Sequence, residues 1–318
     1  MPTNPRGLQL SRRLAGPAVL IALALAGPAA AHPLPQAPSC PIFPPDSAWN
    51  QRVDRLPAAS GSATLIGSIG RGAPVHPHFG AGLWDGHIIG IPINVTSSLT
   101  PRVEVSFDPA YAPRADRGPY PLSPLTRMEP APDRHVIVVD SSSCLDYELY
   151  AAQRVGVGLW SATTGVVFDL HSDRLRPPTW ASADAAGLPI LPGLARYDEV
   201  ADGSIDHALR FTAPRTLAAF VYPARHSDSN SQDPSLPPMG LRVRLKASVN
   251  ISHLPRQARI VALALKRYGM ILADNGPPWN ITGTSDWRWN NLELRALGQL
   301  TGRDFEVVDT STLPHPGQ

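Results

Sequence analysis

The sequence predicts a mainly β protein, an antiparallel β-sandwich or jelly-roll-like double sheet with one or two packed helices. Three observations support this prediction. Apolar and polar residues alternate with a period of two through most of the chain, and clusters of Gly, Pro, Asp and Ser separate the alternating segments. Strong helical periodicity is confined to one segment. A chain of this kind buries its apolar residues between two sheets.

The alternating segments are the predicted strands. In chain order they are RVEVSF (102–107), HVIVVD (135–140), LDYELYAA (145–152), GVVFDLH (165–171), IDHALRF (205–211), LAAFVY (217–222), LRVRLKA (241–247) and MILAD (270–274). A Ser-rich turn between the second and the third predicts a β-hairpin. In the seventh, Arg242, Arg244 and Lys246 share one face, which we interpret as a solvent-exposed face or a cationic wall for an acidic ligand.

One strong amphipathic helix is predicted over LPRQARIVALALKRYG (254–269). Pro255 lies in its first turn and Gly269 is placed as a C-terminal stop. A second helix is predicted over 291–300, and 62–69 carries a shorter helical signal.

Residues 1–31 form a predicted signal peptide. Arg12 and Arg13 precede an apolar stretch that ends in Ala29–Ala31, so we expect cleavage near Ala31. General secretion and twin-arginine export both remain open. The predicted localisation is secreted, extracellular or periplasmic, and no later apolar stretch is long enough for a membrane span.

Residues 32–318 are predicted to form a single secreted β-rich domain with a Pro-rich N-terminal arm at about 32–48. A second Pro-rich stretch, 108–133, is the best boundary if the chain divides. Cys40 and Cys144 are the two cysteines, and an even pair in an oxidising compartment predicts one disulfide.

The charge balance argues against nucleic acid as a partner. The chain has 28 basic and 26 acidic residues, and the leader holds three of the arginines and no acid, so 25 and 26 remain after cleavage. A near-neutral protein lacks the electrostatic footprint for nucleic acid. The expected partner is an extracellular polysaccharide or cell-envelope glycan, bound by a monomer.

No known catalytic motif is present, so candidate residues come from their chemistry and position. A glycan hydrolase needs two carboxylates, for which Asp85, Asp184 and Asp274 are candidates. A polysaccharide lyase needs a base such as His207 or His226 beside an arginine such as Arg225. We therefore predict two groups. The catalytic group is Asp184, His207, His226 and Asp274, and the substrate-binding group is Trp84, Asp85, His135, Trp180, Arg225 and Trp279.

Several candidates also have a purely structural interpretation. Asp184 and Asp274 precede turns, where an aspartate often accepts hydrogen bonds from its own backbone. Residues 194–203 (LARYDEVADG) indicate a helical turn that ends at Gly203, and a strand follows near Ile205. His207 then faces inward with apolar neighbours, and we do not expect the nearby acids to be its partners.

Metal ligands are possible, but no metal or cofactor is predicted. His76 and His78 have H-x-H spacing, which puts two imidazoles on one face of a strand. The sequences DRH (133–135) and RHSD (225–228) would add ligands only if the fold brings them together.

Several long strings resemble a family of secreted, functionally uncharacterised bacterial β-rich proteins over about residues 133–309. They are SADAAGLPILPGLARYDEV, IDHALRFTAPRT, VYPARHSDS, LPPMGLRVRLKASVNIS and ALKRYGMILADNGPPWNITG. The resemblance implies an exported β-rich protein that acts at the cell envelope or on an extracellular polymer. It carries no activity and no site residues.

These observations together predict a secreted carbohydrate-active enzyme, either a glycoside hydrolase or a polysaccharide lyase. The alternative is a non-catalytic glycan-binding or structural envelope protein, which needs only the aromatic residues and a disulfide-tied sheet.

Overall fold

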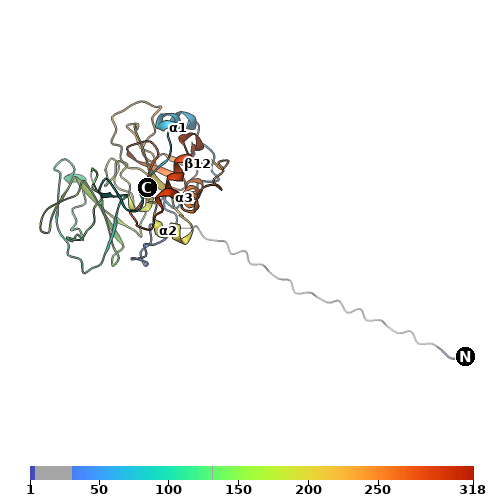
Figure 1. Cartoon of the computed structure of the whole chain (residues 1–318), viewed down its shortest axis with the longest axis horizontal. Helices are drawn as coiled ribbons and strands as arrows, with labels where there is room; N and C mark the ends of the chain where they lie inside the picture. Colours follow the sequence, from blue (N-terminus) through green and yellow to red (C-terminus); the bar gives the residue numbers. More distant parts are fainter. Residues whose placement is uncertain (4–30, 131) are drawn as a thin grey trace.

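The computed structural model describes residues 1–3, 31–130 and 132–318, so nearly all of the predicted signal peptide lies outside the described residues. Within them the chain forms several β-sheets and a few short helices, which confirms a mainly β fold. Figure 1 places the strands of residues 93–169 on one side of the molecule. Helices α1 (Ser62–Gly70) and α3 (Arg256–Arg267) lie on the other side.

The largest sheet has six strands in the order β1-β14-β11-β13-β12-β15. Their bounds are β1 His76–His78, β11 Leu209–Ala213, β12 Arg242–Leu245, β13 Met270–Asn275, β14 Asn280–Thr282 and β15 Phe305–Val307. The pairs β1–β14 and β11–β13 are parallel, and the other pairs are antiparallel. The sheet therefore joins strands from both ends of the chain.

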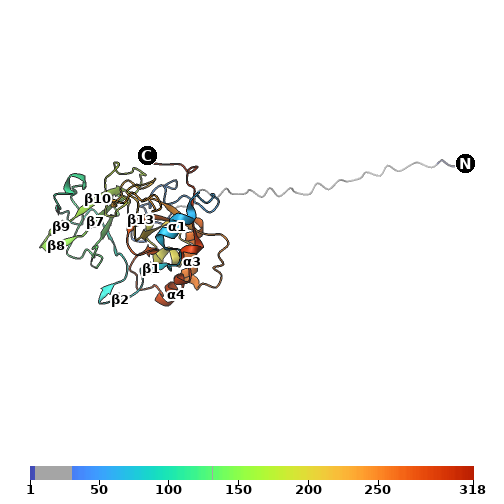
Figure 2. The same ribbon diagram turned by 90° about the horizontal axis from the view of Figure 1, so that it is seen from above.

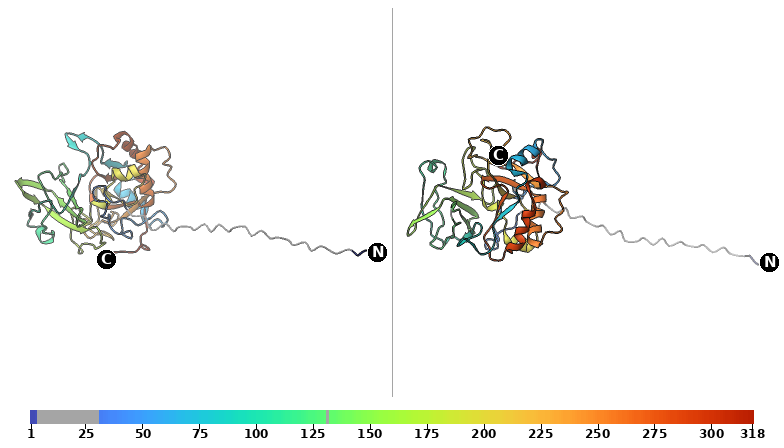
Figure 3. Two further views of the ribbon diagram at one scale, coloured as in Figure 1. Left: turned by 90° about the horizontal axis from the view of Figure 1, so that it is seen from below. Right: turned by 45° about the horizontal axis from the view of Figure 1, so that its top comes forward.

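Helix α3 lies against the six-stranded sheet (Figure 3, right). It buries an apolar face that includes Ala258, Val261 and Leu265. The turn to β13 needs glycine, because Gly269 has a φ of 67° and an added Cβ would lie 2.2 Å from the carbonyl oxygen of Val243. The predicted helix and its stop signal are thus confirmed.

A second sheet has four strands in the order β10-β7-β6-β4, with bounds β4 Ile93–Thr96, β6 Val136–Asp140, β7 Leu145–Tyr150 and β10 Thr164–Asp169. The predicted hairpin is β6–β7, and β4 pairs with β6 in parallel. The smaller sheets are β5 Val105–Phe107, β8 Gln153–Gly156 and β9 Leu159–Ala162, and the hairpin β2 Leu83–Trp84 with β3 His87–Ile88. Figure 2 shows β7–β10 on the side away from α3 and α4 (Asn291–Arg295).

Some finer predictions do not agree with this architecture. The jelly-roll-like double sheet is not confirmed, because both large sheets contain parallel pairs. Residues 217–222 form no extended strand and make one isolated bridge, Phe220 with Met239. The second predicted helix divides into α4 and a short 3-10 helix, Ala296–Gln299.

The basic residues predicted to share one face of β12 donate hydrogen bonds to the backbone of neighbouring segments. Arg242 is buried and donates to the carbonyl oxygens of Ala48, Gln51 and Tyr268 at 2.8–2.9 Å. Burial without a carboxylate partner lowers its pKa to about 9. Arg244 pairs with Glu306 and also donates to carbonyls of the segment after the arm. Neither arginine is free to bind an acidic ligand.

The predicted disulfide joins Cys40 to Cys144, with the two Cα atoms 5.2 Å apart. It ties the N-terminal arm to the turn between β6 and β7. Such a bond is typical of proteins outside the cytoplasm. Among the described helices, none combines the length and apolar character that crossing a membrane requires. Secretion and the single-domain organisation stay predictions.

Replacing both cysteines with alanine should lower the free energy of unfolding by roughly 4–5 kcal/mol. The bond closes a loop of 104 residues, and its loss enlarges the conformational entropy of the unfolded chain. Urea unfolding of the oxidised wild type and of the variant measures the difference. A reductant should lower the urea midpoint of the wild type and leave that of the variant unchanged. Equal midpoints for the two proteins without reductant would contradict the prediction.

Candidate active site

Three segments meet around a polar cavity of about 270 Å³. They are the loop 181–185, the end of β13 and the loop 226–228. Its lining is Tyr111, Asp133, Tyr150, Thr164, Ala181, Ser182, Ala183, Asp184, Ala185, His226, Asp228, Asp274 and Asn275. Three of the four predicted catalytic residues, Asp184, His226 and Asp274, are therefore brought together although they are distant in sequence.

Backbone hydrogen bonds hold these segments in place. The N–H of Ala186 donates to the carbonyl of Ala273, next to Asp274, at 3.0 Å. The N–H groups of Arg225 and His226 both donate to the carbonyl of Ala186, at 2.8 and 3.1 Å. The loop that carries Asp184 is thus attached to β13 on one side and to the His226 loop on the other.

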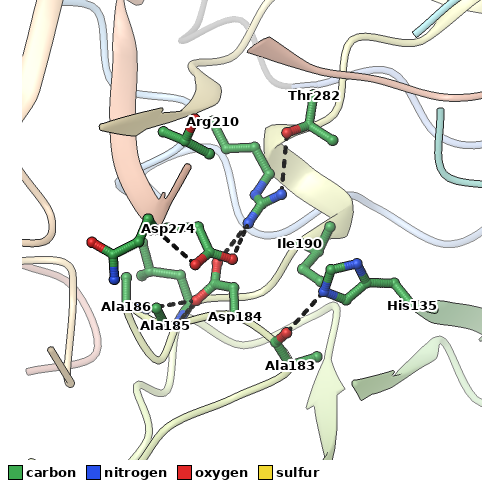
Figure 4. Close-up of polar contacts among 12 residues, drawn as sticks. His135, Ala183, Asp184, Ala185, Ala186, Ile190, Arg210, Asp274 and Thr282 are labelled. Carbon is green, nitrogen blue, oxygen red and sulfur yellow. Dashed lines mark hydrogen bonds and ion pairs between the residues drawn. The ribbon is translucent and has the colours of Figure 1, made fainter. Parts of the chain in front are cut away.

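A buried guanidinium, that of Arg210 on β11, lies between the two carboxylates. One terminal nitrogen donates to Oγ1 of Thr282 at 3.2 Å, and the other is 3.5 Å from Oδ2 of Asp184 and 3.5 Å from Oδ2 of Asp274 (Figure 4). The two Oδ2 atoms are therefore no more than twice that distance apart. The guanidinium of Arg210 therefore pairs with two carboxylates that come from different segments of the chain.

A register shift between β11 and β13 places Asp274 on this side of the sheet. Arg210 is opposite Ile271, but after the shift Thr212 is opposite Asp274. Paired residues of parallel strands point to the same face, so Asp274 shares the face of Arg210 and Thr212. Without the extra residue, Asp274 would point to the opposite face. Irregularities of this kind often re-aim a side chain at a functional site.

The carboxylate of Asp184 is fully enclosed and acts as a positioning group. Its Oδ1 accepts from the N–H groups of Ala186 and Leu188 at 3.0 and 3.1 Å and from the Ser182 hydroxyl at 3.3 Å. Burial raises its pKa to about 7, although Arg210 acts in the opposite direction. The structural interpretation, a turn aspartate, is thus correct, and the ion pair with Arg210 is added to it.

Asp274 is the accessible member of the pair. Its side chain is 28% exposed, whereas that of Asp184 is 0% exposed. Its Oδ1 accepts from the N–H of Asn275 at 2.8 Å. Burial raises the pKa of Asp274, and the positive charges of Arg210 and His135 partly offset this effect. A carboxyl that keeps its proton more readily than usual and can touch a ligand is suited to general acid catalysis.

Other polar groups complete the cavity wall. The Nδ1 of His226 lies 2.8 Å from the carbonyl oxygen of Ala185, so it donates there and Nε2 is the acceptor. Burial raises the pKa of Tyr150, and the charges of Asp133, Asp274 and Asp228 raise it further. The Tyr150 hydroxyl therefore stays protonated beside three carboxylates.

His135 was predicted to bind substrate, and its ring is buried behind the cavity wall. Its Nε2 lies 3.1 Å from the carbonyl oxygen of Ala183, and Nδ1 contacts Oε2 of Glu129 (Figure 4 shows the Ala183 contact). This pairing lowers the pKa of Glu129 and raises that of His135, in each case against the effect of burial. Its ring packs 5.5 Å from that of Tyr150.

An acid pair lies behind the site, on strand β7. Asp146 and Glu148 lie on β7 and are 0% exposed. Oε1 of Glu148 accepts from the N–H groups of Ile190 and Leu191 at 2.7 and 2.9 Å, but neither oxygen of Asp146 has a partner among the described residues. Burial, followed by the charge of Glu148, raises the pKa of Asp146 well above its usual range. The pair therefore retains a proton in the folded state.

His207 lies outside the cavity, and its prediction as a catalytic residue is corrected. It is 1% exposed, and its Nε2 is 3.0 Å from Oε2 of Glu199, which also pairs with Arg196 at 2.7 Å. Although burial acts to raise it, Arg196 and the contact with His207 lower the pKa of Glu199 to about 2. The expectation that nearby acids are not partners of His207 is also wrong, because α2 (Tyr197–Asp202) ends at Gly203 and folds Glu199 back onto it.

The three tryptophans predicted to bind substrate do not line the cavity. Trp279 is completely buried between the rings of Phe211 and Phe305, at 5.6 and 5.1 Å, so it cannot contact a substrate. Trp84 and Asp85 lie on the β2–β3 hairpin, which projects from the body of the molecule (Figures 2 and 3).

Trp180 and Arg225 lie beside the cavity without lining it. Trp180 packs against Arg176, whose guanidinium carbon is 5.5 Å from the ring. Arg225 donates from Nε to the carbonyl of the same Arg176 at 2.9 Å. Both side chains therefore support the neighbouring loop.

No family model matches the chain, and no curated protein and no solved structure shows significant similarity to it.

Asp146→Asn should stabilise the protein relative to the wild type at pH 8 more than at pH 4, by at least about 1.4 kcal/mol, the free energy that corresponds to one unit of raised pKa. A carboxyl whose folded pKa is raised contributes stability at low pH and loses it as pH rises through that pKa. Urea unfolding of both proteins at the two pH values measures the effect.

The matched control is Glu104→Gln, which neutralises an exposed carboxylate. It should show no such pH-dependent difference. A difference between Asp146→Asn and the wild type that is the same at pH 4 and pH 8 would show that Asp146 has an ordinary pKa.

Proposed function

We propose that the protein is a secreted, monomeric glycoside hydrolase that cleaves neutral or amino-containing glycans in this cavity. The observation that carries the proposal is the partly exposed carboxyl of Asp274, held by Arg210 in a cavity with further carboxylates. Glycoside hydrolysis needs one carboxyl that donates a proton and a second that acts as base or nucleophile.

We assign the proton donor to Asp274 and the second carboxylate to Asp228. Desolvation of Asp274 supports the protonated form, whereas Asp228 is exposed to water at the cavity wall. Asp184 keeps Arg210 in place and does not contact the substrate. The Tyr150 hydroxyl, the Asn275 amide and Thr164 offer hydrogen bonds to sugar hydroxyls.

The charge of the cavity favours a hydrolase over a lyase for acidic polymers. A lyase needs a cation that neutralises the substrate's carboxylate. The cavity exposes Asp133, Asp228 and Asp274, while Arg210 is buried beneath it and Arg225 does not line it. A polyuronate would meet like charges here, and a neutral or cationic sugar would not.

The test is an assay of new reducing ends on neutral glycans, amino-containing glycans and polyuronates. Wild-type protein should cleave a member of the first two classes and no polyuronate. Asp274→Asn should lower kcat by about 10²–10⁴-fold, the usual contribution of a positioned general acid. Wild-type activity should fall as pH rises through the raised pKa of Asp274, because the donor is then ionised.

Glu104→Gln is the control, since it removes an exposed carboxylate outside the cavity and should leave kcat unchanged. Tight binding of a glycan with no product would favour the alternative, a glycan-binding envelope protein. An Asp274→Asn variant with wild-type kcat would refute the assignment of the acid.

A further inference from the structure

We propose that Glu129, Asp133 and His135 bind one divalent transition-metal ion, of the Zn²⁺ or Mn²⁺ type, at the edge of the cavity. One potential ligand atom from each side chain lies within 4.8 Å of the others. The proposal goes beyond the proposed hydrolase activity and does not depend on it, since it concerns binding alone.

The orientation of His135 supports the proposal. Its Nε2 donates to the carbonyl of Ala183 at 3.1 Å, which directs Nδ1 to the two carboxylates. Metal-binding histidines commonly donate their second ring nitrogen to a backbone carbonyl, because this fixes the ring and raises its basicity. The carbonyl of Ala183 is not one of the three candidate ligands, so it orients the His135 ring independently of them.

Burial differs among the three ligands in a way that suits an open metal site. Glu129 and His135 have side chains only 10% and 4% exposed, while Asp133 is exposed and lines the cavity. An ion there would have protein on one side and the cavity on the other. Three protein ligands with a free position for water or substrate are typical of catalytic metal sites.

Charge also favours a cation at this place. Asp133, Asp184, Asp228 and Asp274 all line the cavity, and the buried Glu129 lies beside Asp133. Among the described residues, the arginine that pairs with these carboxylates is the buried Arg210, which contacts Asp184 and Asp274. A divalent ion would offset the excess of carboxylates.

The donor set selects the class of metal. An imidazole nitrogen with two carboxylate oxygens suits Zn²⁺ and Mn²⁺. Ca²⁺ takes six to eight oxygen ligands, and Mg²⁺ keeps most of its water.

The H-x-H pair on β1 is the rival site. His76 and His78 are both exposed, with ring centroids 6.5 Å apart. The cluster of three residues adds carboxylates and buried positions that this pair lacks, and the two sites can be separated by mutation.

The experiment uses full-length mature protein without a polyhistidine tag, treated with a chelator and then titrated with Zn²⁺ or Mn²⁺ in a calorimeter. Elemental analysis after dialysis measures the stoichiometry. One ion per chain is expected. Asp133→Asn changes an exposed residue and should weaken binding at least about tenfold. Glu129→Gln should do the same, and circular dichroism verifies that each variant is folded.

Two controls distinguish the site from its surroundings. Glu104→Gln, outside the cavity, and the double variant His76→Gln/His78→Gln should both keep wild-type affinity and stoichiometry. Absence of saturable binding by the wild type at submillimolar metal would overturn the proposal. So would wild-type affinity in Asp133→Asn, or loss of binding only in the double histidine variant. None of these outcomes depends on glycan cleavage.

Discussion

The candidate site depends on the burial of one cation, the guanidinium of Arg210. A buried charge is costly unless opposite charges and hydrogen bonds compensate it, and removal of a partner leaves an uncompensated charge. Asp184, Asp274 and the hydroxyl of Thr282 compensate the charge of Arg210, whose Nε has no partner among the described residues. These partners come from a loop and from the two strands that flank β11. Arg210 therefore holds two of the three cavity segments, the loop of Asp184 and the end of β13, to the same place.

Asp146 and Glu148 lie behind Asp184 and Asp274, and Glu148 acts on Asp184 electrostatically. Glu148 accepts two backbone N–H groups at the start of the 3-10 helix Leu191–Gly193, and its charge raises the pKa of Asp184. Burial raises the pKa of both Asp146 and Glu148, and the charge of Glu148 raises that of Asp146 further. The protonation of the site is thus controlled by the interior of the protein as well as by water in the cavity.

Part of this could be predicted from the sequence. Asp184, His226 and Asp274 are adjacent in space as predicted, and the disulfide and helix α3 are confirmed. The role of Asp146 and Glu148 could not be predicted, because alternation on β7 does not reveal that apolar clusters cover both faces of the sheet.

Three further features depended on three-dimensional detail. A period-two pattern contains no signal for the one-residue shift between β11 and β13, which decides the face of Asp274. His207 and Glu199 are only eight residues apart, but their contact depends on the chain reversal at Gly203. Trp279 was misassigned because aromatic composition alone does not separate a stacked core ring from an exposed one.

The six-stranded sheet has a consequence for the order of events in folding. Its edge strand β1 begins at His76 and pairs with β14, which begins at Asn280, and β15, from Phe305, closes the other edge. Chains whose contacts join residues distant in sequence fold slowly, because long loops must close before the contacts stabilise them. This sheet cannot form until almost the entire chain has left the ribosome. Until then, the strands of this sheet that have already been synthesised lack the partners with which they pair in the folded protein.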